Sequence, residues 1–451
     1  MKPTTPILDP FTWQVEALAA WESARRRGMI EAVTGTGKTH VAIGALVKLH
    51  AEVKPLSTLV VVPSIPLMNQ WYERLTSAFP RERVGRIGNG FKDDFSILPV
   101  ACVAVINSAV LKAETLLAHC RKGLNKSFLI ADECHHYIEA PVFSRIRQFP
   151  FDYTLGLSAT IFNYDVSGLG RVVYEYKFKD AFKDGIVPPF DLVNVAVPLT
   201  SQERDTYLQL SEDIGSQLKK IRSLFESDLA GLPDQFFFNR LKQLMSQQGG
   251  NDDPTIKRLF ILLFKRAKVY YMAEKKMQLA VKLTKLLVDQ GRKKTVVFFE
   301  RILSADGVAE DVAHSAATKL HRELDRDEEI WCRVYHSGLS KIDRERCLSE
   351  FRNAGPSALL ACRGLDEGVD IPDVDGAILA ASTQSVRQRV QRIGRTLRKG
   401  DGKKRPIIVT LFAPGTNDSN VTSEDRATFQ DVATIHDESD RTCLGKVRQL
   451  L

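Results

Sequence analysis

The feature that most constrains the fold of this chain is a glycine-rich segment between an apolar run and a helical pattern. The apolar run is Met29–Val33 and the helical pattern is His40–His50. The segment itself reads Ala32-Val33-Thr34-Gly35-Thr36-Gly37-Lys38-Thr39. A strand–loop–helix unit of this composition predicts a phosphate-binding site in an α/β fold.

Each residue type in the segment has a physical role at such a site. Gly35 and Gly37 let the backbone turn so that successive N–H groups face phosphate oxygens. Lys38 is placed for the β- and γ-phosphates, and the Thr39 hydroxyl is placed for Mg²⁺. We therefore predict that the nucleotide is bound by Thr34, Gly35, Thr36, Gly37, Lys38 and Thr39. A turn rich in glycine and threonine that binds no ligand is the alternative.

Short β-branched runs alternate with helical patterns in two parts of the chain. The runs are Met29–Val33, Thr58–Val62, Val100–Ile106, Ser127–Asp132 and Tyr153–Leu157 in the first part, and Thr295–Phe299, Arg333–Tyr335, Ser357–Ala361, Gly376–Ala380 and Pro406–Leu411 in the second. Continuous apolar runs suit strands that are buried on both faces, as in a parallel sheet covered by helices. We predict an α/β domain over 1–195, a helical insertion over 196–290, a second α/β domain over 291–415 and a C-terminal tail over 416–451.

Two carboxylates end the apolar run Ser127–Asp132. A phosphate loop that hydrolyses ATP needs a carboxylate on the metal ion and a base for water. Asp132 suits the first role and Glu133 the second, whereas solvated acids at a strand end are the alternative. The histidines that follow, His135 and His136, suit coupling between the ATP site and neighbouring loops, or else an ordinary polar turn.

Composition excludes several classes of protein. A chain that is 44% hydrophobic and 26% charged is not mostly disordered. No apolar stretch is long enough for a transmembrane helix, and the first residues lack the apolar core of a signal peptide. The seven cysteines are odd in number and form no C-x-x-C pair, which argues against a disulfide framework and indicates a reducing cytosol.

The net charge of +8 is concentrated in two segments. Residues 256–285 contain nine Lys or Arg and one acid, with Tyr270 and Tyr271 among them. Basic residues with interleaved aromatics suit a surface that follows a nucleic-acid backbone, here with Lys265, Arg266 and Lys268. An amphipathic helix whose tyrosines pack while its lysines reach water is the alternative.

The second basic segment, Gln388–Arg398, spaces four arginines three residues apart. On a helix, Arg389, Arg392, Arg395 and Arg398 would lie along one face and repel one another. A polyanion would relieve that repulsion, and a solvated basic face is the alternative.

The order of these segments over about residues 10–412 resembles the superfamily 2 helicases and translocases. Their motifs Ia to III resemble Val61–Trp71, Ile106–Ser108, Asp132–His135 and Ser158–Thr160, and their later motifs resemble Val296–Glu300, His336–Gly338, Arg363–Pro372 and Gln391–Arg398. The resemblance implies two tandem RecA-like domains and an ATP-hydrolysing enzyme that uses ATP and Mg²⁺, with Mg²⁺ held by Thr39 and Asp132.

The resemblance also assigns roles to single residues. It makes Gln14 the adenine-reading glutamine, places Gly368 and Asp370 at the ATP cleft, and makes Arg395 and Arg398 arginine fingers, with Gln391 near the γ-phosphate. It gives His135, Ser158 and Thr160 a coupling role, and Ser64, Ser108 and Arg363 contacts with nucleic acid.

Within the superfamily, Asp132–His136 and Gln391–Arg398 look most like the branch of the xeroderma pigmentosum group B type helicases and the type III restriction enzyme helicase subunits. This resemblance implies an ATP-dependent DNA helicase or translocase in DNA repair, recombination, restriction or phage defence. Its nucleic-acid partner would be single- or double-stranded DNA. A protein partner would be a nuclease, a methyltransferase or another subunit of a complex. We expect a cytoplasmic location, on the nucleoid in a prokaryote. An RNA helicase and an ATP-gated clamp or scaffold subunit are the alternatives.

Overall fold

The computed structural model describes the chain except residues 1–9, 34, 94–99, 111–125, 137–142, 144, 147, 160–167, 187–189, 230–236, 239, 242–243, 245–252, 300–311, 327–329, 337, 363–373, 381–404, 421–431, 437–439 and 451. The described residues fall into two compact units, with one sheet in each and the change between Pro189 and Phe190. Each of the two units is an α/β domain, as the alternation of apolar runs and helical patterns predicts.

The first sheet has eight strands in the order β4-β3-β5-β2-β6-β7-β1-β8. Their bounds are β1 Arg27–Ala32, β2 Leu56–Val62, β3 Val84–Gly88, β4 Phe91–Lys92, β5 Ala101–Val105, β6 Lys126–Ala131, β7 Tyr153–Ser158 and β8 Val172–Tyr176. All pairs are parallel except β3 with β4. The predicted runs of the first part are the central strands, because only strands with helices on both faces are apolar along their whole length.

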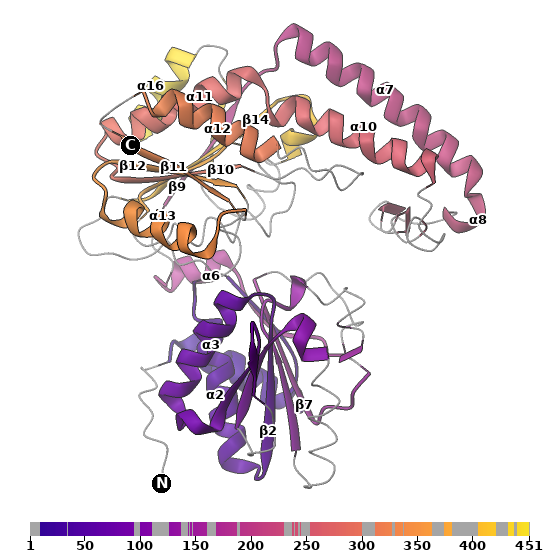
Figure 1. The fold of residues 1–451 in the computed structure, drawn as a ribbon, viewed down its shortest axis with the longest axis vertical. Helices are drawn as coiled ribbons and strands as arrows, with labels where there is room; N and C mark the ends of the chain where they lie inside the picture. Colours follow the sequence, from indigo (N-terminus) through magenta and orange to yellow (C-terminus); the bar gives the residue numbers. More distant parts are fainter. Residues whose placement is uncertain are drawn as a thin grey trace. The chain divides into compact units, whose positions relative to one another are not determined.

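The helices of the first unit are α1 Thr12–Ser23, α2 Lys38–Glu52, α3 Ile65–Ala78 and α6 Phe178–Lys183, with short 3-10 helices η1 Arg81–Arg83 and η2 Cys134–His136. Helices α2 and α3 pack against the sheet (Figure 1). Every third or fourth residue of α3 is buried, at Met68, Trp71 and Leu75, which is the spacing of one helix face.

The second sheet has seven parallel strands in the order β11-β12-β10-β13-β14-β9-β15. Their bounds are β9 Asp191–Ala196, β10 Lys294–Phe299, β11 Trp331–His336, β12 Ser357–Cys362, β13 Gly376–Leu379, β14 Ile407–Phe412 and β15 Val432–His436. Helices α11 Glu274–Asp289, α12 Val312–Leu324, α13 Lys341–Asn353 and α16 Asp440–Leu450 belong to the same unit. A 3-10 helix, η4, spans Asn417–Ser419.

Three segments lie elsewhere than their predicted domains. Strand β9 precedes the insertion in sequence, yet it pairs with β14 and β15 in the second sheet rather than ending the first domain at residue 195. The predicted tail supplies β15 and α16, whose Val447 is buried in the core of the second sheet. Helix α11, predicted as part of the insertion, packs its leucines into that same core.

What remains of the insertion is a helical extension of the second unit. Helices α7 Ser201–Leu224 and α10 Pro254–Tyr271 run side by side, and the short α8 is Glu226–Leu229 (Figure 1). They share a separate apolar cluster that includes Ile214, Ile221, Leu259 and Leu262. Among the described residues, no helix combines the length and the apolar composition that a bilayer crossing requires.

Candidate ATP site

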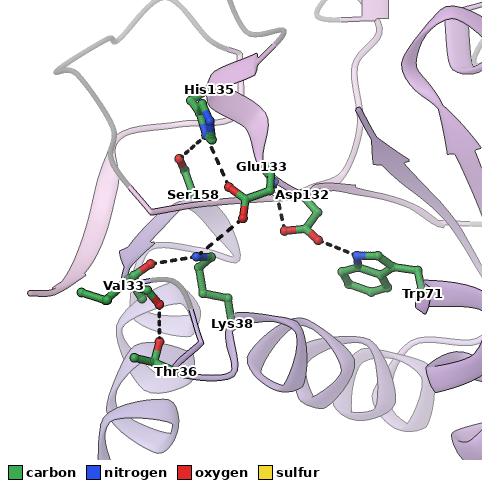
Figure 2. Close-up of polar contacts among 9 residues, drawn as sticks. Val33, Thr36, Lys38, Trp71, Asp132, Glu133, His135 and Ser158 are labelled. Carbon is green, nitrogen blue, oxygen red and sulfur yellow. Dashed lines mark hydrogen bonds and ion pairs between the residues drawn. The ribbon is translucent and has the colours of Figure 1, made fainter. Parts of the chain in front are cut away.

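The phosphate loop leaves β1 at Ala32 and opens α2 at Lys38, as predicted. Gly35 and Gly37 have φ of 88° and 94°, a region that glycine enters without steric cost. The Thr36 hydroxyl donates to the Val33 carbonyl at 2.7 Å, which closes the turn (Figure 2). The described residues of the loop therefore form a tight turn of the kind that a phosphate loop needs.

Gln14 of α1 contacts the same loop. Its Nε2 donates to the carbonyls of Thr36 and Gly37, both at 3.3 Å, and its Oε1 accepts the Phe11 N–H at 3.1 Å. A Cβ at Gly37 would lie 2.7 Å from that Nε2, so the contact adds a second reason for glycine at this position. In this structure the Gln14 amide holds the loop, and its predicted contact with adenine stays a prediction.

The two carboxylates follow β6, which is separated from β1 and its phosphate loop by one strand, β7. Lys38 is buried; its Nζ donates to the Ala32 carbonyl at 2.9 Å and lies 3.8 Å from Glu133 Oε1. Glu133 has a φ of 47°, an unusual backbone conformation for a residue other than glycine. That conformation belongs to the turn that follows β6 and brings the glutamate to the lysine (Figure 2).

The glutamate continues the contacts toward β7. Glu133 Oε2 lies 3.4 Å from His135 Nδ1, and the same nitrogen lies 2.7 Å from Ser158 Oγ at the end of β7. A single chain of polar contacts thus runs from the phosphate loop to the end of β7 through Lys38, Glu133, His135 and Ser158 (Figure 2). The coupling role of His135 and Ser158 stays a prediction.

Asp132 is 3% exposed and lies beside a second acid. Burial, and then the charge of Glu133, raise the pKa of Asp132 to about 6, although bonds from Trp71 and the Glu133 N–H oppose the shift. A divalent cation would offset both effects, so the acid pair fits a metal ion. Thr39 lies half-buried in the first turn of α2. Mg²⁺ commonly takes one or two protein oxygens together with phosphate and water, which is the donor set that Thr39 and Asp132 would supply.

The predicted nucleic-acid contacts of the first domain lie at the same edge of the sheet. Ser64 follows β2 as the N-cap residue of α3, and Ser108 follows β5. Because β1, β2, β5 and β6 are parallel, their carboxyl ends meet at one edge, where Lys38 and Asp132 also lie. The structure therefore brings these residues to one edge of the first domain.

Of the basic residues predicted to contact nucleic acid in the insertion, two line a groove and one packs on the neighbouring helix. Lys265 and Lys268 line a groove of about 480 Å³ between α7 and α10. The Arg266 guanidinium instead lies 5.7 Å from the Tyr207 ring centroid and packs on α7. Tyr270 and Tyr271 are buried, as the packing alternative predicts, so neither is a free stacking platform.

The remaining predicted residues fall outside the described part of the chain. They are Thr34, Thr160, Arg363, Gly368, Asp370, Gln391, Arg395 and Arg398.

Sequence reasoning missed one residue of the site. The Trp71 indole N–H donates to Asp132 Oδ2 at 2.5 Å, and both side chains are buried (Figure 2). The helical spacing of the apolar residues Met68, Trp71 and Leu75 was visible in the sequence, and it indicates that these side chains face the sheet. The pairing of that side chain with a residue 61 positions later was not visible.

Two regions of the chain match known families. Residues 7–163 match the type III restriction enzyme res subunit family, and residues 276–400 match the helicase conserved C-terminal domain. The chain is 28% identical over 412 residues to the DNA 3'-5' translocase XPB2 of Sulfurisphaera tokodaii, covering 90% of this chain and 82% of that protein. It is 23% identical over 416 residues to the putative DNA 3'-5' helicase Rad25 of Halobacterium salinarum, covering 92% of this chain but 56% of that longer protein.

Among solved structures, the fold is similar to that of the Pyrococcus furiosus Hef helicase domain. The TM-score is 0.60 at 17% identity, with 94% of this chain and all of that chain covered. At this identity the likeness establishes the fold, two RecA-like domains in tandem.

Proposed function

Because the chain belongs to the superfamily 2 helicases and translocases, on the branch of the XPB-type helicases and type III restriction enzyme res subunits, we propose that it couples ATP hydrolysis to movement on DNA. It is an ATP-hydrolysing enzyme of the helicase class. The observation that carries the proposal is the chain of contacts from Lys38 through Glu133 and His135 to Ser158. A chain of this kind joins the lysine of the phosphate loop to the end of β7.

The substrate is ATP and the metal ion is Mg²⁺ in this proposal. The N–H groups of the phosphate loop and Lys38 bind the phosphates, and Thr39 and Asp132 hold Mg²⁺, which neutralises charge on the phosphates when bound. Glu133 orients the attacking water and accepts its proton, and its Oε1 lies 3.8 Å from Lys38 Nζ. Gln391, Arg395, Arg398, Gly368, Asp370 and Thr34 keep their predicted roles at the nucleotide, and Thr160 its predicted coupling role.

DNA is the proposed nucleic acid, in single- or double-stranded form. The first two relatives are named for action on DNA, which favours DNA over the RNA-helicase alternative. Ser64 and Ser108 at the carboxyl edge of the first sheet, with Arg363 and with Lys265 and Lys268 of α10, are the proposed contacts. Such backbone contacts make binding dependent on salt and nearly independent of sequence.

The proposed setting is DNA repair, with restriction or defence as a second candidate because the first half matches a restriction-enzyme family. A nuclease, a methyltransferase or another complex subunit would be the protein partner. A cytoplasmic location remains a prediction.

The test is ATP hydrolysis without nucleic acid and with single-stranded DNA, duplex DNA or RNA. We expect stimulation by DNA; stimulation by RNA alone would contradict the proposal. A protein that no nucleic acid stimulates, but that binds a protein partner in an ATP-dependent manner, would instead be the clamp or scaffold.

Two variants test the site itself. Lys38→Ala should abolish turnover, because the buried ammonium group that binds phosphate is lost. Glu133→Gln should still bind ATP and should trap the protein on DNA, because the base is lost while the loop is intact. Hydrolysis at the wild-type rate by either variant would refute the site assignment.

A further inference from the structure

Trp71 links helix α3 to the carboxylate that would hold the metal ion. Its side chain is 0% exposed, and its Nε1 lies 2.5 Å from Asp132 Oδ2 (Figure 2). A hydrogen bond to an ionised acceptor is stronger than one between neutral groups. The indole is therefore bonded to the carboxylate itself and does more than fill space beside it.

Both oxygens of Asp132 are held by the protein. The Glu133 N–H donates to Oδ1 at 3.0 Å, while Trp71 donates to Oδ2. The Asp132 N–H in turn donates to the Val61 carbonyl at 2.9 Å, which fixes the backbone at the end of the strand. A carboxylate with one donor on each oxygen has a defined rotation about its side-chain bonds before any ligand arrives.

The sequence gives α3 the rigidity that this role needs. The helix follows β2 directly, and its buried residues Met68, Trp71 and Leu75 anchor one face against the sheet. Strand β2 also lies beside β6, so the helix that follows β2 and the aspartate that follows β6 leave the sheet at adjacent positions.

We propose that Trp71 is a positioning residue that orients the Asp132 carboxylate for Mg²⁺ through its indole N–H. This inference rests on the proposed function, because it gives a supporting residue to the same metal site. Partners of metal-ligating groups commonly change metal affinity by about 10–100-fold when they are removed. Removal of the indole N–H should therefore weaken Mg²⁺ binding and leave the phosphate loop intact.

The chain offers a matched control for lost packing. Trp21 of α1 is also buried in the first domain, and its Nε1 donates to the Thr154 carbonyl at 2.8 Å. Trp21→Phe and Trp71→Phe each remove one buried indole and one hydrogen bond from the same domain. Only the second removes a donor from Asp132, so a difference between the variants reports on the carboxylate.

The experiment has two readouts on the full chain. The first is ATP hydrolysis against Mg²⁺ concentration, which separates the half-saturating concentration from kcat. The second is binding of a fluorescent ADP against Mg²⁺ concentration, which needs no turnover. We expect Trp71→Phe to raise the half-saturating Mg²⁺ concentration at least tenfold in both, with kcat at saturating Mg²⁺ within about threefold of wild type. Trp21→Phe should stay within about twofold of wild type in both.

Three results would overturn the inference. They are an unchanged Mg²⁺ dependence in Trp71→Phe, an equal change in the two variants, and a fall in kcat that added Mg²⁺ does not restore. If the wild-type protein shows no Mg²⁺-dependent nucleotide binding or hydrolysis, the proposed function is refuted. The inference about Trp71 is then refuted as well. Circular dichroism melts of both variants identify a Trp71→Phe protein that does not fold. Trp71→Met, whose flexible apolar side chain carries no hydrogen-bond donor, then serves in its place with the same expected shift.

Discussion

The buried ion pair between Lys276 and Asp418 gives a sharp prediction about stability. Lys276 lies on α11 and Asp418 in η4 just after β14, with Nζ and Oδ2 2.8 Å apart and side chains 0% and 2% exposed. Asp418 Oδ2 also accepts the Ala413 N–H at 2.9 Å, so the carboxylate holds the chain that leaves β14. Lys276 was counted among the basic residues that favour nucleic acid, but its burial removes it from any surface.

The variant Asp418→Ala leaves an ammonium group buried without its counter-charge. Removal of one partner of a buried pair costs roughly 3–5 kcal/mol, and the Ala413 N–H loses its acceptor as well. At about 2–4 °C of Tm per kcal/mol for a large domain, the second domain should melt roughly 6–20 °C lower. Lys276→Met should show a loss of similar size, because it leaves the carboxylate buried instead.

The double variant tests the reasoning more closely than either single one. Lys276→Met with Asp418→Ala leaves neither charge buried, so it should cost clearly less than the sum of the single variants. The exposed pair of Arg326 and Glu323 in the same domain is the control, and Glu323→Ala should cost less than about 1 kcal/mol.

Urea unfolding gives the free energies, and hydrogen exchange of peptides from β14 and η4 assigns the loss to the second domain. Single variants that cost under about 1 kcal/mol, or a double variant that costs the full sum, would refute the argument.

Three further predictions concern coupling, nucleic-acid contact and the packing of the helical extension. His135→Ala removes the link between Glu133 and the end of β7. The affinity for ATP should stay within about threefold of wild type, while DNA should no longer stimulate hydrolysis. A stimulation factor equal to that of wild type would contradict the coupling role. Lys265→Ala combined with Lys268→Ala should weaken DNA binding and lower the slope of log affinity against log salt by about 2. The control is Lys275→Ala, which removes an exposed lysine of α11 and should change neither quantity. An equal effect of the double variant and the control would show that the groove does not contact DNA. Arg266→Ala should instead lower the stability of the α7–α10 pair, as measured by hydrogen exchange, because its guanidinium packs on a tyrosine ring.

The parts of the site that local spacing determines were predictable from the sequence. Gly35, Gly37 and Lys38 lie within one turn of the chain, and Asp132 and Glu133 are adjacent, so the chemistry of each group could be inferred from its neighbours alone. The central strands were predictable for a similar reason, because burial on both faces makes a run such as Leu56–Val62 apolar throughout.

The parts that depend on distant partners were not predictable. Trp71 belongs to the site only because β2 and β6 are neighbours, and Lys276 is a structural residue only because η4 comes back to α11. The segments that form β9 and β15 were assigned to the first domain and to a C-terminal tail, because the order of strands in a sheet is independent of their order in sequence.

The place of β9 between β14 and β15 has a consequence for how the protein is made. Strand β9 leaves the ribosome with the first domain, but its partner β14 begins more than 200 residues later. At about 5–20 residues per second, the apolar strand waits roughly 10–40 s for that partner. During this interval the newly made chain carries an unpaired strand edge beside a finished first domain, which is the kind of surface that chaperones bind. Strand β9 has both of its neighbours only after β14 and β15 are made, so synthesis must pass the last of the helicase motifs before the second sheet is complete.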